Sequence, residues 1–207
     1  MTTAVKICGI TRVNDALAAA RLGAHAIGLI FHAQSPRNIA PERAVEIIRD
    51  LPPFVTTVGL FVNADARAVA RVCEQVPLNL LQFHGEETPE FCRQFHLPYI
   101  KAVRVRGGLD LLQYAQLYSA ARGLLLDAFV EGAHGGTGTA FDWGLIPRDL
   151  RLPVILSGGL NADNIADAIR RVRPPAVDVS SGVEASPGIK DPRKIAAFMK
   201  EVRSADV

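Results

Sequence analysis

A cysteine at the end of a short apolar run is the first side chain placed to do chemistry. Residues 4–8 have the pattern of a β-strand that ends in Cys8, and Thr11 begins a helical pattern. Cys8 therefore lies where a strand passes into a βα loop, at the edge of α/β sheets where ligands bind. Strand alternation puts Lys6 on the same face, one layer deeper, and a nearby ammonium favours the thiolate form of a cysteine.

Lys6 needs a compensating charge, because a lysine buried alone is costly. Asp178 lies on the last apolar strand with Ser180 on the same face. The first and last strands become neighbours once a barrel closes. We therefore expect Lys6 and Asp178 to approach within ion-pair distance.

Asp127 is the second candidate for chemistry, because it directly follows the three leucines of residues 124–126. Partial desolvation suits a carboxyl group to work as a general acid. The alternative is that Asp127 only caps a loop, as aspartates often do. A thiol and a carboxyl on different strand ends of one mouth predict proton transfer by a base and an acid, without a metal.

Two glycine-containing loops carry the next chemical signal. Gly158 and Gly159 follow the seventh predicted strand, and Ser181 and Gly182 follow the eighth. Taken singly, each loop is an ordinary strand-ending turn. Glycines let backbone N–H groups approach an anion closely, and loops after strands 7 and 8 form the common phosphate site of (βα)8 barrels. Together these four residues predict binding of a phosphorylated small molecule.

The apolar runs that position these residues alternate with helical patterns. The predicted strands cover residues 4–8, 26–31, 55–62, 78–83, 99–103, 124–127, 154–157 and 177–180. Eight such units, with strands that lack clean alternation, favour a closed parallel sheet. We predict an α/β fold with one (βα)8 TIM barrel over residues 1–207, eight parallel strands inside an outer ring of helices. The rival is a Rossmann or flavodoxin-like sheet, but no GxGxxG motif follows the first strand.

Several helix boundaries are marked by local signals. Helical patterns cover residues 41–51, 109–118 and 161–172, and Thr88 caps a further helix that has Pro89 at its first position. Asp191 and Pro192 begin the last helix in the same way. Residues 141–150 predict only a weak helix, which Pro147 interrupts.

Composition and charge exclude several classes of partner. The formal net charge is +2 with acids and bases interspersed, which is not typical of proteins that bind nucleic acid or anionic membranes. No apolar run approaches the length that spans a bilayer. Cys73 and Cys92 fall on apolar helix faces, where we expect them to be inert, and the cysteines have no zinc-type spacing. We expect a reduced, cytoplasmic protein with no metal and no cofactor; its state as monomer or homodimer stays open.

Short motifs in a fixed order form a highly specific set: Lys6-Ile7-Cys8-Gly9-Ile10-Thr11, Ser35-Pro36-Arg37, Gln82-Phe83-His84-Gly85, Leu126-Asp127, Gly135-Gly136-Thr137-Gly138, Phe141-Asp142-Trp143, Gly158-Gly159-Leu160, Ser180-Ser181-Gly182-Val183-Glu184, Gly188 and Lys190-Asp191. This set resembles the phosphoribosylanthranilate isomerases of tryptophan biosynthesis, from the first strand to the last helix. His25 and Ser157 depart from the pattern, since an acid and an alanine are expected there. Neither position has chemistry assigned to it in that family.

The resemblance implies an Amadori rearrangement of N-(5-phosphoribosyl)anthranilate to 1-(2-carboxyphenylamino)-1-deoxyribulose 5-phosphate. It implies that Asp127 is the general acid that protonates the furanose ring oxygen and opens the ring to a Schiff base. Cys8, as thiolate, is then the base that removes the C2 proton. The resulting enolamine tautomerises to the ketone.

Further roles follow for residues near the predicted mouth. Arg37 is expected to meet the anthranilate carboxylate, because its planar fork suits such a group. Gln82 is expected to bond the ribosyl part, and Asp178 a substrate hydroxyl, in addition to or in place of pairing with Lys6. We expect His84 to be structural or rim-exposed, since the mechanism needs no imidazole.

Other functions stay as alternatives at this stage. A different phosphosugar isomerase or lyase could use the same phosphate site, but a related aminoaldose isomerase is expected to have an aspartate where Cys8 stands. A non-catalytic phosphometabolite-binding barrel is a second alternative. A thiol-based redox sensor is disfavoured, because Cys8 has no resolving partner in sequence. The loop of residues 132–138 is expected either to order over substrate or to be a plain flexible loop.

Overall fold

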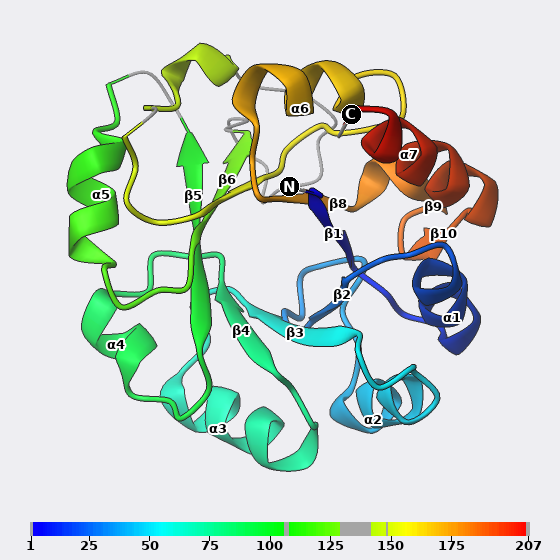
Figure 1. Cartoon of the computed structure of the whole chain (residues 1–207). Coiled ribbons are helices and arrows are strands. Elements are labelled where there is room, and N and C mark those ends of the chain that lie inside the picture. Colours follow the sequence, from blue (N-terminus) through cyan, green and yellow to red (C-terminus); the bar gives the residue numbers. More distant parts are fainter. Residues whose placement is uncertain (1, 106–107, 129–141, 148, 206–207) are drawn as a thin grey trace.

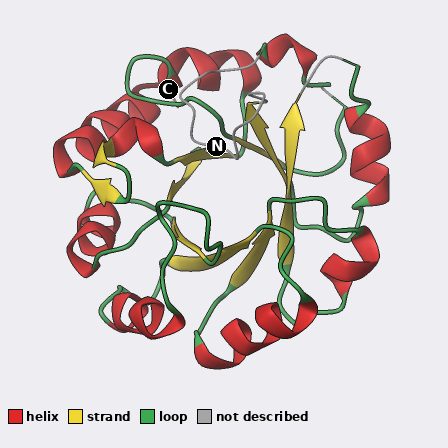
Figure 2. Cartoon of the chain, turned by 180° about the vertical axis from the view of Figure 1, so that it is seen from behind, coloured by secondary structure: helices red, strands yellow, loops and turns green. Residues whose placement is uncertain are grey.

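Eight parallel strands close into a barrel, in the order β1-β2-β3-β4-β5-β6-β7-β8. The structure is a computed structural model that describes residues 2–105, 108–128, 142–147 and 149–205. Helices surround the strands, as Figures 1 and 2 show from the two ends of the barrel. The predicted (βα)8 TIM barrel is confirmed. Its strands are β1 (Ala4–Cys8), β2 (Ala26–Ile30), β3 (Thr56–Phe61), β4 (Leu80–Phe83), β5 (Tyr99–Val105), β6 (Leu124–Ala128), β7 (Val154–Leu156) and β8 (Ala176–Val179).

Several helices begin where the sequence supplies a capping residue or a proline. The Thr88 hydroxyl accepts from the N–H of Phe91 at the start of α4, and Asp110 caps α5 in the same way. Proline stands at the first position of α2, α4 and α7, where its missing N–H costs nothing. The helices are α1 (Val13–Arg21), α2 (Pro41–Arg49), α3 (Ala66–Gln75), α4 (Pro89–Arg93), α5 (Leu111–Leu117), α6 (Ile165–Val172) and α7 (Pro192–Ala205), with 3-10 turns η1 (Trp143–Leu145) and η2 (Ser181–Val183).

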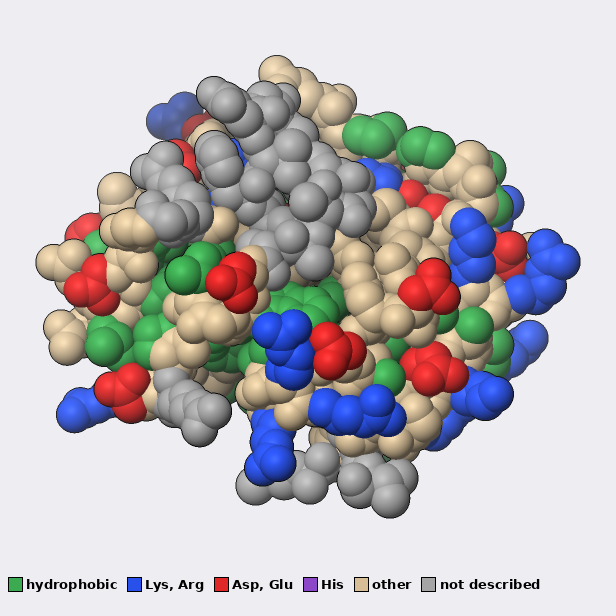
Figure 3. Space-filling view, turned by 90° about the horizontal axis from the view of Figure 1, so that it is seen from above, with side chains coloured by type: hydrophobic (Ala, Val, Ile, Leu, Met, Phe, Trp, Pro, Cys, Tyr) green, Lys and Arg blue, Asp and Glu red, His purple; other side chains and the backbone are tan. Residues whose placement is uncertain are grey.

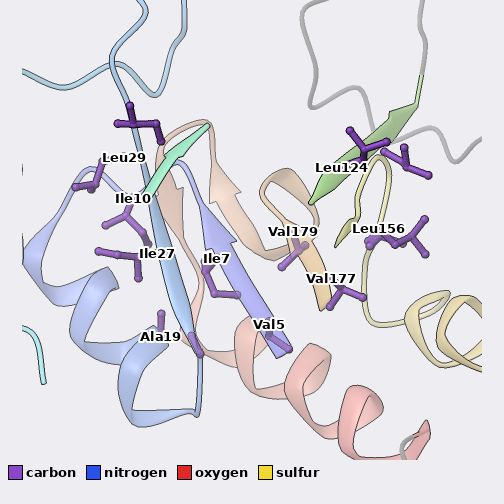
Figure 4. Packing of buried hydrophobic residues seen from close by; sticks show 14 of the residues in the cluster. Val5, Ile7, Ile10, Ala19, Ile27, Leu29, Leu124, Leu156, Val177 and Val179 are labelled. Atoms are coloured by element: carbon purple, nitrogen blue, oxygen red, sulfur yellow. The ribbon is translucent and has the colours of Figure 1, made fainter. Parts of the chain in front are cut away.

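Alternation along each strand divides the apolar side chains into two layers. The outward-facing residues pack between the strands and the helices; Figure 4 shows Val5, Ile7 and Ile27 in this layer. The inward-facing residues form smaller clusters inside the barrel, one of which contains Cys8 with Ile30 and Leu60. Inward-facing side chains near the carboxyl ends of the strands can therefore line a site there.

One helix starts later than its pattern predicts. The apolar periodicity begins at residue 161, but α6 begins at Ile165. The N–H of Asn161 donates to Asn164 Oδ1 at 2.9 Å, and the Asn161 side chain accepts from the N–H of Asp163. Asparagine side chains that bond nearby backbone in this way favour a turn over a helix.

The weak helix predicted over residues 141–150 is reduced to the single turn η1. Asp142 Oδ1 accepts from the N–H of Gly144, which caps this turn. Pro147 has no N–H with which to continue it. Residues 141 and 148 lie outside the described residues.

A short antiparallel hairpin after β8 was absent from our expectations. It consists of β9 (Glu184–Ser186) and β10 (Ile189–Lys190). Gly188 makes the turn with a φ of 80°, in the left-handed region that favours glycine. Strands this short leave little periodicity to detect in the sequence.

The described surface is mixed in charge. Lys and Arg side chains lie beside Asp and Glu on the face seen in Figure 3. Exposed pairs such as Arg93 with Glu90 contribute to this pattern. Among the described residues, no helix combines the length and hydropathy that crossing a membrane requires.

Phe83 tests the packing of the outer apolar layer. Its side chain is fully buried, and its ring centroid lies 5.7 to 5.9 Å from those of Phe91, Phe95 and Tyr99. We predict that Phe83→Ala lowers the free energy of unfolding by about 3–5 kcal/mol, because it removes this contact area and leaves a cavity. Urea denaturation followed by circular dichroism measures the change. Phe54→Ala is the control: Phe54 is 95% exposed, and we expect a change below about 0.5 kcal/mol.

Candidate active site

A single pocket at the carboxyl ends of the strands brings the predicted site residues together. Its empty volume is about 760 Å³, and its lining includes Cys8 from β1, Gln82 from β4 and Asp127 from β6. The lining also includes the predicted residues Arg37, Gly158, Gly159, Asp178 and Ser181. Gly182 is the one predicted site residue that does not line it. The strand-end residues meet because parallel strands present all their carboxyl ends at one edge of the barrel.

The predicted ion pair between the first and last strands is confirmed. Lys6 and Asp178 face each other in the ladder of β1 and β8, and Lys6 Nζ lies 2.7 Å from Asp178 Oδ1. Both side chains are buried. Burial disfavours the ammonium, but Asp178 and Cys8 together outweigh this effect, so the pKa of Lys6 is raised. Ser157 Oγ donates to Asp178 Oδ2 at 3.2 Å. The serine that stands here in place of the expected alanine therefore has a hydrogen-bond partner.

Cys8 is less acidic than its position beside Lys6 suggested. Burial raises the pKa of the Cys8 thiol, whereas Lys6 acts in the opposite direction and only partly compensates. The sequence expectation gave the correct sign for Lys6, but it omitted the larger desolvation effect. Gly28 on β2 is what admits the thiol, because a Cβ there would come within 2.7 Å of Cys8 Sγ.

Asp127 contacts a histidine that the sequence analysis expected to be structural or rim-exposed. His84 Nε2 lies 3.1 Å from Asp127 Oδ2, and the two side chains are 13% and 7% exposed. The second ring nitrogen, Nδ1, lies 2.9 Å from Gln82 Nε2. Gln82 and His84 are two residues apart, so their side chains point to the same face of the strand. This spacing was the sequence signal that could have placed His84 in the pocket.

Gln82 has unused hydrogen-bonding capacity. Its side chain is completely buried, yet its Oε1 has no hydrogen-bond partner among the described residues. A buried acceptor without a partner is costly and rare in native proteins. A ligand hydroxyl would satisfy it.

Arg37 lines the pocket with its planar fork already engaged. Its Nε donates to Glu184 Oε1 at 2.8 Å, and Nη2 donates to Glu184 Oε2 at 2.7 Å. Lys190 Nζ also lies 2.8 Å from Glu184 Oε1. Burial alone would raise the pKa of Glu184. Arg37 and Lys190 together outweigh this effect, so the pKa of Glu184 is lowered. Glu184 belongs to the motif of residues 180–184, but no role in the site was predicted for it.

The first glycine loop has two successive residues in the left-handed region of backbone conformation. Gly158 and Gly159 have φ values of 82° and 66°, and successive residues of this kind can turn their N–H groups toward one point. A Cβ on Gly182 would overlap the carbonyl oxygen of Leu160, so Gly182 allows the two loops to approach. Asn164 Nδ2 donates to the carbonyl of Gly159 and holds the first loop in place.

Arg104 is a further lining residue that the sequence analysis missed. It faces Asp127 in the ladder of β5 and β6. Its inward direction follows from alternation with Ala102, which lies inside the barrel. The pocket therefore contains cationic side chains as well as the two candidate catalytic groups.

Comparison with known sequences gives a consistent result. The family model described as N-(5'phosphoribosyl)anthranilate (PRA) isomerase matches residues 5–201. The N-(5'-phosphoribosyl)anthranilate isomerase of Nitrosospira multiformis is 64% identical over 202 residues, which cover 98% of this chain and 97% of the relative. That of Dechloromonas aromatica is 58% identical over 206 residues and covers 100% and 99% of the two chains.

Solved structures agree over nearly the whole chain. The phosphoribosyl anthranilate isomerase of Thermotoga maritima superposes with a TM-score of 0.89 at 44% identity, covering 98% of this chain and all of the relative. A phosphoribosyl anthranilate isomerase in complex with reduced 1-(o-carboxyphenylamino)-1-deoxyribulose 5-phosphate gives a TM-score of 0.86 at 43% identity, with the same coverage.

The raised pKa of Cys8 predicts how the thiol reacts. Because a higher pKa leaves less thiolate at a given pH, we expect alkylation of Cys8 by iodoacetamide to have its midpoint above about 8.5, the value of an ordinary thiol. Lys6→Met removes the cation that lowers this pKa, so the midpoint moves to still higher pH. Mass spectrometry of the Cys8 peptide across a pH series measures both midpoints. Free cysteine in the same pH series is the control for an ordinary thiol, and a Cys8 midpoint below that of free cysteine would contradict the prediction.

Proposed function

This chain belongs to the N-(5'-phosphoribosyl)anthranilate isomerase family of tryptophan biosynthesis and catalyses the isomerisation of N-(5'-phosphoribosyl)anthranilate; we propose that Cys8 is the base of this reaction and Asp127 the acid. The substrate is N-(5-phosphoribosyl)anthranilate and the product is 1-(2-carboxyphenylamino)-1-deoxyribulose 5-phosphate. The observation that carries this assignment of roles is the opening of both groups into one pocket, beside the glycine loops after β7 and β8.

Asp127 acts first, as the general acid. It gives a proton to the furanose ring oxygen, and the bond between this oxygen and C1 breaks. The lone pair of the anthranilate nitrogen then forms a C1–N double bond, which gives the protonated Schiff base. The near-complete burial of Asp127 supports this role, because a water-poor site keeps the transferred proton from solvent.

Cys8 acts second, as the general base. Its thiolate removes the proton from C2, the electrons of that C–H bond form a C1–C2 double bond, and the C–N electron pair returns to nitrogen. The enolamine loses its hydroxyl proton and gains one at C1, which gives the ketone. Lys6 supports the thiolate form, since it lowers the pKa of Cys8 against the effect of burial.

The remaining predicted residues bind the substrate around this pair. Gly158, Gly159, Ser181 and Gly182 receive the phosphate through backbone N–H groups. Gln82 offers its Oε1, which has no partner among the described residues, to a ribosyl hydroxyl. Asp178 accepts from another hydroxyl while it stays paired with Lys6.

Arg37 meets the anthranilate carboxylate in this proposal. A guanidinium carries five N–H donors, and the contacts to Glu184 use only the Nε and Nη2 groups. The pairing holds the guanidinium in one orientation, so less side-chain freedom is lost when substrate binds.

Residues 1–207 act as a single catalytic domain in this proposal, since the barrel closes by pairing a strand from each end of the chain. A reduced catalytic thiol fits an enzyme of the cytoplasm, where disulfides are rare. The loop of residues 132–138, which we expected either to order over substrate or to be a plain flexible loop, lies outside the described residues.

Removal of either reacting group tests the catalytic assignment. We expect Cys8→Ala and Asp127→Ala each to lower kcat by about 10²- to 10⁴-fold, which is the range for loss of a general acid or base. Turnover of freshly prepared phosphoribosylanthranilate, followed by loss of its fluorescence, measures the effect, and circular dichroism checks folding. Cys73→Ala is the control, because Cys73 lies on α3 outside the pocket. Undiminished turnover in Cys8→Ala or Asp127→Ala would remove that residue from the mechanism.

A glycine of the phosphate loop tests the binding assignment. We expect Gly158→Val to raise KM by about tenfold or more with a smaller change in kcat, because it disturbs contacts made equally in ground and transition states. Gly23→Val is the matched control: Gly23 also has a positive φ, of 101°, but lies after α1 at the other end of the barrel. A loss confined to kcat in Gly158→Val would contradict the phosphate role.

A further inference from the structure

Lys101 is a buried lysine to which the mechanism assigns no role. It lies on β5 between Ile100 and Ala102, which face the barrel interior, so its side chain points outward. The side chain is completely buried, and burial lowers the pKa of Lys101 although Glu87 partly opposes this effect. Burial of a charged group costs free energy, so a buried lysine without a catalytic role needs a structural explanation.

The ammonium of Lys101 is bound to the loop that connects β4 to α4. We call residues 84–88 the His84 loop. Lys101 Nζ donates to the carbonyl of Gly85 at 2.6 Å and lies 3.4 Å from Glu87 Oε2. It also donates to the carbonyl of Phe83, directly before the loop, at 3.3 Å. One cation thus ties together three points of a short segment.

Glu87 completes this attachment from inside the loop. Its Oε2 accepts from the N–H of Gly85 at 2.9 Å, and its Oε1 accepts from the N–H of Asn63 at 2.7 Å. The Glu87 carbonyl accepts from the Tyr118 hydroxyl at 2.7 Å. Gly85 has no room for a side chain, since a Cβ would overlap Asn63 Oδ1. The loop is therefore held by β5, by Tyr118 directly after α5 and by the segment after β3.

The residue that this attachment presents to the pocket is His84. An amide nitrogen can only donate, so the 2.9 Å contact with Gln82 Nε2 makes His84 Nδ1 an acceptor. The other ring nitrogen, Nε2, lies 3.1 Å from Asp127 Oδ2. The direction of the Asp127 carboxyl group thus depends on where the loop places His84.

We propose that the buried Lys101–Glu87 ion pair positions His84 against the Asp127 carboxyl group, and that catalysis depends on this placement. The inference rests on the proposed role of Asp127 as general acid. Lys101 and Glu87 touch no substrate, so they act as positioning residues. A displacement of about 1 Å at a reacting group can cost about 100-fold in rate, so a small shift of the loop is sufficient to matter.

Lys101→Met is the primary test, because it removes the charge and keeps the length of the side chain. We expect kcat for phosphoribosylanthranilate to fall by about 10- to 100-fold with KM changed far less. Arg93→Met is the matched control, since it removes an exposed cation from the neighbouring α4 and should leave kcat unchanged.

A double-mutant cycle separates positioning from simple stabilisation. If Lys101 acts through His84, then Lys101→Met lowers kcat in the wild-type background but has no further effect, within about twofold, in the His84→Ala background. Equal fold-losses in both backgrounds, or a folded Lys101→Met enzyme with unchanged kcat, would overturn the proposal. Tyr118→Phe, a milder change that deletes one bond to the loop, enters the same cycle and keeps the test decisive where Lys101→Met does not fold.

The same assay distinguishes failure of this proposal from failure of the proposed function. Wild-type turnover that is lost in Asp127→Ala, combined with equal losses in both backgrounds, rejects only the positioning role. Turnover that is unaffected by Asp127→Ala rejects the acid role and the positioning proposal with it.

Discussion

The architecture depends on the pairing of β1 with β8, which closes the barrel around a buried ion pair. Lys6 and Asp178 stand opposite each other in this ladder. Two charges removed from water are tolerated only when they are paired and hydrogen-bonded, and Ser157 supplies the donor for the second carboxylate oxygen. A slip of one residue would turn either charge to the other side of the barrel wall, so the ion pair opposes such slips. The register that satisfies Lys6 is also the one that brings Cys8 to the mouth.

Burial has two opposite consequences for the proposed role of Cys8 as a base. It raises the pKa of the thiol and so reduces the fraction of thiolate at neutral pH. The thiolate that does form is a stronger base toward a carbon-bound proton, because basicity rises with pKa. Lys6 limits the loss of thiolate by lowering the pKa of its neighbour. The arrangement therefore keeps a strong base within reach of ionisation, which suits the removal of the C2 proton that we propose for Cys8.

Charged side chains at the mouth are held in pairs that link loops far apart in the chain. Glu184, from the hairpin after β8, fixes Arg37 from the loop after β2. Lys101 and Glu87 perform a comparable task on the opposite side, where they fix the loop that carries His84. In both cases a buried or half-buried charge orders a polar group of the pocket before substrate arrives. Such pre-ordering lowers the entropy that binding and catalysis would otherwise cost.

Local patterns were sufficient to predict the barrel, the strand-end positions of Cys8 and Asp127, and the shared face of Lys6 and Cys8, because periodicity encodes how a side chain points relative to its own strand. The Lys6–Asp178 pair could be added because closure of a parallel barrel makes the first and last strands neighbours. Periodicity could not identify His84 as the partner of Asp127, 43 residues away, or Glu184 as the partner of Arg37, 147 residues away. Those contacts depend on the paths of loops and the shear of the closed sheet, and the burial that raises the pKa of Cys8 exists only after the strands have closed into a barrel.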